Sequence, residues 1–151
     1  MRILKPIFLI ATLLIFPQLT YAQIANDFMI GISGDLVKTD TDGLLKKAQI
    51  GAEINYFLHR KVTVSGGIDL WTDSDDKVSF IIGGRWFPTE DFFVRARGLV
   101  GQNDITIGGG WTQPINEHLK FEAIGDFYFK TDFSIRIGIN YIFRQKIESQ
   151  E

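Results

Sequence analysis

The feature that most constrains the fold is a two-residue alternation of apolar and polar side chains that continues through most of the chain. Near the C-terminus, for example, Phe133 and Ile135 alternate with Ser134 and Arg136. Successive side chains of a β-strand point to opposite faces, so this alternation predicts strands with one apolar and one polar face. No stretch keeps a helical period, and we therefore expect an all-β fold. Eight strand segments can be assigned, at residues 27–37, 48–57, 62–71, 77–87, 92–101, 104–112, 119–130 and 132–143.

Short connections between these segments predict that strands adjacent in sequence pair with each other. The connections at 58–61, 88–91 and 114–118 are compact, and Pro88 and Pro114 suit tight turns. Eight antiparallel strands that each pair with the next form an up-and-down barrel when the first also pairs with the last. Closure removes the edge strands that an open sheet of this apolarity would expose. The sequence thus predicts an eight-stranded antiparallel up-and-down barrel.

The N-terminal segment has the features of a secretory signal peptide. Arg2 and Lys5 precede an apolar run at 7–16, and Thr20-Tyr21-Ala22 is a suitable cleavage site. The run is shorter than the roughly 20 apolar residues that a membrane-spanning helix needs. An uncleaved N-terminal anchor is the alternative. The chain is therefore divided into a signal peptide at 1–22, a barrel at 23–143 and a short charged tail at 144–151.

The direction in which the apolar face points separates two kinds of barrel. A lipocalin-type barrel puts its apolar row inside around a ligand, whereas an outer-membrane barrel puts that row outside against lipid. The polar row carries balanced charges, and four of its five cations are arginines, which suit bidentate buried ion pairs. Such balance is what a narrow interior needs, because an unpaired buried charge is costly. The residues of this expected lumenal charge network are Asp35, Glu53, Asp69, Arg85, Arg95, Arg97, Lys120, Glu122, Asp126 and Arg136.

An energy estimate gives the same orientation for a barrel in a membrane. A cation on the lipid face costs up to ~2–4 kcal/mol near the bilayer midplane. Five of them would cost on the order of 10–20 kcal/mol, which exceeds the stability of a typical domain. Strands of this length, tilted by roughly 40°, span about 25–28 Å, the height of the apolar band of a membrane barrel. We therefore predict a transmembrane β-barrel whose polar row faces the lumen.

Aromatic residues gather near the strand ends. Two girdles of aromatic side chains at the membrane interfaces are typical of membrane barrels, although aromatics also favour strands in general. The strand ends at the compact turns hold Tyr56, Phe57, Trp86, Phe87, Phe92, Phe93, Trp111, Tyr141 and Phe143, and the opposite ends hold Trp71 and Phe129. The residues that we predict at the interfaces are Tyr56, Trp71, Trp86, Trp111 and Phe129.

The last strand resembles the C-terminal assembly signal of bacterial outer-membrane barrels. The matching positions are Arg136, Gly138, Tyr141 and Phe143. The strand ends at 55–57 and 84–88 are similar to those of opacity-protein-like and OmpA/OmpX-type eight-stranded barrels. The resemblance implies insertion into the bacterial outer membrane and recognition by the barrel-assembly machinery. The chain departs from the family in the eight residues that follow Phe143 and in its short outer loops, and the short loops argue against an adhesion role.

Composition and motif searches point to no catalytic, cofactor or metal site. The chain has no cysteine, two histidines and a formal net charge of −2, so neither thiolate chemistry nor nucleic-acid binding is indicated. His59 and His118 fall in turns. Glu122 and Asp126 share a strand face and suggest acid–base chemistry, but ion pairing with arginine is the simpler interpretation. The connections at the outer end contain several acids, whose spacing fits no cation-binding motif. These acids are Asp40, Asp42, Asp73, Asp75 and Asp76.

These observations favour an integral outer-membrane barrel with a lumen filled by side chains and a structural or surface role. We expect no catalytic activity and no cofactor, a monomer, and outer-membrane lipid as the surroundings. A secreted or periplasmic lipocalin-like carrier of an apolar ligand is the main alternative. A narrow channel for small solutes and an outer-leaflet lipid-modifying enzyme are two others.

Overall fold

In the residues that it describes, the computed structural model forms eight β-strands, which confirms the predicted all-β fold. None of the described residues forms a helix that is both long and apolar enough to cross a membrane. The predicted signal peptide, the acids at 40, 42, 73, 75 and 76, and all of the predicted tail except Arg144 lie outside the described residues. The structure describes residues 25–38, 49–72, 78–130 and 133–144. The strands are β1 (Phe28–Lys38), β2 (Gln49–His59), β3 (Val62–Trp71), β4 (Val78–Trp86), β5 (Phe92–Val100), β6 (Asp104–Pro114), β7 (Leu119–Tyr128) and β8 (Phe133–Phe143).

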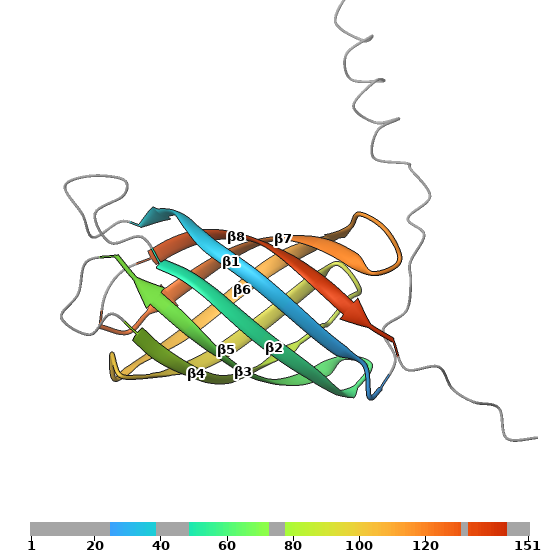
Figure 1. The fold of residues 1–151 in the computed structure, drawn as a ribbon, viewed down its shortest axis with the longest axis horizontal. Coiled ribbons are helices and arrows are strands. Elements are labelled where there is room, and N and C mark those ends of the chain that lie inside the picture. The colour runs from blue at the N-terminus through green and yellow to red at the C-terminus, as the bar shows by residue number, and fades with distance from the viewer. Residues whose placement is uncertain (1–24, 39–48, 73–77, 131–132, 145–151) are drawn as a thin grey trace, which may run out of the picture.

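The eight strands form a closed barrel in which each strand pairs with the next in antiparallel order. Closure is made by β1 and β8, which lie side by side in Figure 1 and pair from Phe28↔Phe143 to Lys38↔Ser134. We call the end formed by the β2–β3, β4–β5 and β6–β7 connections, where β1 begins and β8 ends, the turn end. The opposite end is the loop end. The topology is the predicted up-and-down barrel.

The sidedness of the wall follows the alternation in the sequence. In β8 every second residue is buried, and the exposed residues between them are apolar or aromatic. Large apolar side chains from all eight strands are exposed on the outside, among them Ile82, which is 68% exposed. A soluble protein rarely exposes an apolar surface that surrounds the whole molecule. The outer wall of this barrel therefore has the character of a lipid-facing surface.

Two apolar clusters lie inside the barrel, one toward each end. The cluster at the turn end contains Phe57, Phe87 and Phe93, whose rings pack in series with centroid distances of 5.8 Å and 5.6 Å. Met29, Ile124 and Ile142 complete it. At the loop end, Ile81, Leu99 and Tyr128 pack together with Trp71 against them. On β4 and β5 the inner-row arginines Arg85, Arg95 and Arg97 lie between residues of these two clusters.

Candidate functional site

The buried charges of the lumen form the candidate site. The structure places the side chains of all ten residues named from the sequence on the inner side of the wall. Nine of them form one continuous series of ion pairs, which we call the lumenal charge network. Its order is Glu122–Arg85–Glu53–Arg95–Asp126–Arg97–Asp69–Arg136–Asp35.

Arg85 organises the half of the network nearer the turn end. Its Nη1 donates to both carboxylate oxygens of Glu122 at 2.9 Å. Its Nε and Nη2 donate to Oε1 of Glu53 at 3.1 Å and 2.9 Å. The guanidinium carbon also lies 4.9 Å from the centre of the Phe93 ring, so the cation rests on the apolar cluster. One side chain of β4 thereby links β2 with β7 across the lumen.

Arg95 and Arg97 occupy the middle of the network. They are two residues apart on β5, so both point inward, and both bind the carboxylate of Asp126 on β7. Arg95 Nε donates to Asp126 Oδ1 at 2.9 Å, and Arg97 Nη2 donates to Oδ2 at 2.9 Å. Arg97 Nε also donates to the Thr106 hydroxyl at 3.3 Å, which connects β6 to the network.

Arg136 organises the half nearer the loop end. It contacts Asp35 of the neighbouring strand β1 through Nε at 3.1 Å and Asp69 of β3 through Nη2 at 3.2 Å. Gln49 Nε2 donates to the other oxygen of Asp69, and the Tyr128 hydroxyl donates to Gln49 Oε1 at 2.7 Å. Arg136 is fully buried, so its charge is balanced entirely within the lumen.

Lys120 lies apart from the network although it is on the same inner row. It is buried near the turn end, where it pairs in register with Asn140 of β8. Lys120 makes no ion pair with any residue that the structure describes. The grouping of the other nine residues follows from the forked geometry of arginine, which binds two carboxylates at once.

The network offers little for acid–base catalysis. Glu122 and Asp126, the carboxylate pair noted in the sequence, are held by different arginines, and their side chains are 2% and 0% exposed. Their oxygens therefore accept hydrogen bonds instead of facing a space for substrate. Among the described residues, no group of three or more His, Cys, Asp or Glu side chains is placed to hold a metal ion.

Two glycines of the inner row make room for carboxylates of the network, a role that the sequence analysis did not assign. A Cβ on Gly51 would lie 1.8 Å from Asp69 Oδ1, and a Cβ on Gly108 would lie 2.1 Å from Asp126 Oδ1. Each carboxylate thus occupies the space that a side chain on the adjacent strand would fill. The sequence did contain a sign of this role, because each glycine lies an even number of residues from the inner-row polar residues of its strand and so belongs to the polar row.

Four of the five predicted interface aromatics lie on the outer wall. Trp86 and Phe129 are exposed, Trp111 less so, and the Tyr56 hydroxyl donates to Asn26 Oδ1 at 2.8 Å. Trp71 differs from the prediction. It continues the inner row of β3, stacks edge-on against Tyr128 at 6.2 Å and donates from Nε1 to Ser79 Oγ at 3.0 Å.

Three phenylalanines near the turn end also differ from the expected girdle. Phe57, Phe87 and Phe93 are buried in the apolar cluster of the lumen. Each is adjacent in sequence to an aromatic residue of the outer wall, because successive side chains alternate across the wall.

The four positions of the predicted assembly signal divide between the two faces of β8. Arg136 and Gly138 are on the inner row, and Tyr141 and Phe143 are on the outer wall with ring centroids 4.7 Å apart. The His118 ring stacks on Tyr141 at 5.4 Å, and its Nδ1 is 3.1 Å from the carbonyl oxygen of Ile142. The role of these residues in assembly stays a prediction.

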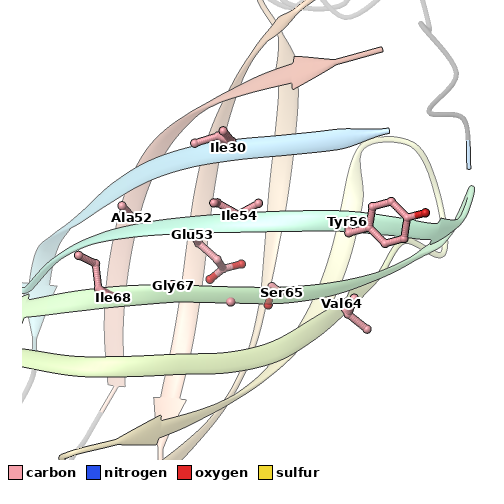
Figure 2. A pocket seen from close by; sticks show the side chains of 10 residues that line it. Ile30, Ala52, Glu53, Ile54, Tyr56, Val64, Ser65, Gly67 and Ile68 are labelled. Carbon is pink, nitrogen blue, oxygen red and sulfur yellow. The ribbon is translucent and has the colours of Figure 1, made fainter. Parts of the chain in front are cut away.

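Figure 2 shows an apolar depression on the outer wall over β1, β2 and β3. Ile30, Ile54 and Ile68 line it, and Gly66 lies within it. Glu53 leaves β2 on the side opposite to Ile54, toward the lumen, so the picture shows the alternation on which the network depends. A second apolar depression lies over β7, β8 and β1. Both are open to the surroundings of the barrel.

Comparisons with known proteins identify the fold. No protein-family model matches the sequence, and no curated protein matches it significantly. The N-terminal β-barrel domain of Pseudomonas aeruginosa OprF is similar with a TM-score of 0.60 and 18% identity, covering 80% of this chain and 100% of that chain. Ail, the attachment invasion locus protein of Yersinia pestis, has a TM-score of 0.55 and 12% identity, with coverage of 80% and 100%. A de novo designed transmembrane β-barrel has a TM-score of 0.60 and 14% identity, with coverage of 81% and 99%.

At these identities the likeness is one of fold. The chain has the closed eight-stranded barrel fold that the OprF domain and Ail share, and this is the fold that the sequence resemblance predicted.

Proposed function

We propose that this protein is an integral outer-membrane β-barrel with a structural or surface role and a closed lumen. The observation that carries the proposal is the sidedness of the wall. Apolar side chains face outward on all eight strands, and nine of the ten inner-row charges named above are ion-paired inside. In water this outer surface would be an aggregation liability, whereas in a bilayer it is matched by acyl chains.

The contents of the lumen favour a structural role over a conduit. An eight-stranded barrel has an interior only wide enough for side chains. Here the lumen holds an apolar cluster toward each end and a paired charge network between them. A solute would have to displace both kinds of contact. We accordingly expect neither solute conduction nor catalysis.

The same contents argue against a lipocalin-like carrier. Such a carrier needs an apolar cavity inside the barrel to bind an apolar ligand. The middle of this lumen is instead lined by arginine and carboxylate side chains. Binding an apolar ligand there would separate buried ion pairs, at a cost of several kcal/mol each.

The bacterial outer membrane is the location that best fits these features. The predicted signal peptide accounts for export, and the predicted signal in β8 accounts for delivery by the barrel-assembly machinery. The likeness in fold to OprF and Ail supports the same compartment. In this membrane the short turns would face the periplasm. We expect a monomer, because closure leaves no strand edge for a second copy.

Membrane fractionation tests the proposal. Cells expressing the full chain are separated into soluble and outer-membrane fractions, and the membranes are washed with alkaline carbonate. We expect the protein to stay in the washed outer membrane and to migrate faster on SDS gels before boiling than after it. Release by carbonate, or solubility without detergent, would contradict the proposal.

A further inference from the structure

We propose that the hollow between the β2–β3 and β4–β5 turns binds the phosphate of an anionic glycerophospholipid. The inference rests on the proposed membrane location, and it assigns a ligand to one place on the turn end. The residues that line this turn-end hollow are His59, Arg60, Lys61, Phe87, Pro88, Thr89 and Glu90.

Three consecutive basic side chains carry the argument. His59, Arg60 and Lys61 are all exposed, and they lie in or beside the tight turn between β2 and β3. None of the three forms an ion pair with a residue in the described part of the chain, and neither does Glu90 on the other side of the hollow. Two permanent cations are therefore left without an acceptor at a concave surface. A phosphate group supplies oxygens for both, and arginine and lysine are its usual ligands.

The hollow is built on a rigid base. The backbone N–H of Phe87 donates to the carbonyl oxygen of Lys61 at 2.8 Å, so the two turns are joined directly. The Phe87 side chain is fixed within the apolar cluster of the lumen. The Phe92 N–H donates to the Thr89 hydroxyl at 3.1 Å, which holds the second turn. The cations are thus presented from fixed backbone positions.

The outer wall next to the hollow indicates a lipid and not a free anion. Val62 and Trp86 are paired in register where β3 begins and β4 ends, and both are exposed on the lipid-facing side. Trp side chains favour the membrane–water interface. A phosphate in the hollow would sit at the limit of the apolar wall, and its acyl chains could follow that wall toward the bilayer.

Charge is unevenly distributed among the three turns of the turn end, and it favours one of them as the site. The β4–β5 turn carries Glu90 and Asp91, and the β6–β7 turn carries Glu117. Only the β2–β3 turn is basic among these three connections. Of the three turns, this one would therefore be favoured by anionic headgroups.

Native mass spectrometry of the folded full chain in detergent tests the inference. Dioleoyl phosphatidylglycerol and dioleoyl phosphatidylcholine are added in turn, and their dissociation constants are measured. Each Lys or Arg near a membrane surface contributes about 1 kcal/mol to binding anionic lipid, or roughly fivefold in affinity. We expect phosphatidylglycerol to bind at least about fivefold more tightly than phosphatidylcholine. We also expect each of Arg60→Gln and Lys61→Gln to weaken phosphatidylglycerol binding roughly fivefold.

The matched control is Lys130→Gln, which removes an exposed cation beyond β7 at the loop end. It should leave the preference unchanged. The inference would be overturned if the two lipids bound equally well. It would also be overturned if Lys130→Gln weakened phosphatidylglycerol binding as much as the turn variants do, or if the turn variants did not weaken it. Inorganic phosphate that displaces the lipid at matching concentration would also overturn it, because the site would then be one for free anions. Carbonate extraction separately reports on the membrane location, so the two proposals can fail independently.

Discussion

Arginine determines how charge is accommodated at the residue level. Four arginines hold five carboxylates, and each carboxylate of the network has at least one arginine partner. Lysine has a single charged nitrogen and could not bind two carboxylates in fixed directions, as Arg85 and Arg136 do. The geometry of these side chains explains why so many buried charges are compatible with a stable barrel.

Asp126→Asn is expected to destabilise the barrel strongly. It removes the carboxylate that lies between Arg95 and Arg97 and leaves two buried cations side by side on β5. Breaking a buried ion pair from one side costs about 3–5 kcal/mol. Urea unfolding in lipid vesicles, followed by tryptophan fluorescence, gives the free energy of unfolding. Glu117→Gln in an exposed turn is the control, and an Asp126→Asn cost no larger than that of the control would contradict the role of the network.

Gly51→Ala is expected to destabilise through crowding. The new Cβ would lie 1.8 Å from Asp69 Oδ1, so the carboxylate would have to leave Arg136 and Gln49. Overpacking of this kind costs about 1–3 kcal/mol. Gly66→Ala is the matched control on the outer wall, because the nearest atom to its Cβ would be 3.8 Å away. The same urea titration should show no loss for Gly66→Ala, and equal effects of the two substitutions would exclude the crowding explanation.

Each strand separates an apolar outer face from an inner face that holds the polar row. The strand ends predicted from the sequence agree with the observed ones within two residues, because turn residues and alternation both mark the ends. The charged row was also identifiable, since balanced acids and arginines have no other low-energy place in a membrane. The sequence did not identify which arginine pairs with which carboxylate, because pairing across the lumen depends on strand tilt and stagger. The sequence analysis places Phe57 and Trp71, at the strand ends, in the outer girdle. Each lies an even number of residues from an inner-row acid of its strand, Glu53 or Asp69, and therefore faces inward.

An arginine scan along the outer wall is expected to show a cost that depends on depth. Ile82 lies near the middle of β4 and Val62 lies at the turn end of β3. Ile82→Arg should lower the free energy of unfolding in vesicles by about 2–4 kcal/mol, and Val62→Arg by about 0–1 kcal/mol. Equal and small costs at the two positions would mean that the outer wall is not in contact with acyl chains.

The whole molecule is a closed barrel whose interior holds two kinds of side-chain contact, apolar packing and ion pairs. Apolar clusters lie toward both ends, and the charge network between them connects seven strands by ion pairs and β6 through Thr106. In the proposed membrane, ion pairs would hold the inside of this barrel together and acyl chains would cover its outside. An eight-stranded barrel has an interior only wide enough for side chains, so we expect no path for transport.

Planar bilayer recording is expected to show no steady conductance. The full chain is incorporated at low density, and the seal is followed across a range of voltages. Brief irregular openings would be consistent with local fluctuation of the turn-end cluster, whereas long openings of one fixed size would contradict a closed lumen. A general porin added to the same bilayer confirms that incorporation and detection work.

The orientation of the wall is tested most directly by site-directed spin labelling, which the absence of native cysteine makes simple. Single cysteines at Ile54, Ile82 and Ile137 are labelled in lipid vesicles, with Arg60 as the turn position. Collision rates with oxygen, which partitions into lipid, and with a water-soluble nickel complex are then compared. The account predicts high oxygen and low nickel accessibility at the three isoleucine positions, and the reverse at Arg60. Nickel accessibility at Ile82 as high as at Arg60 would contradict it.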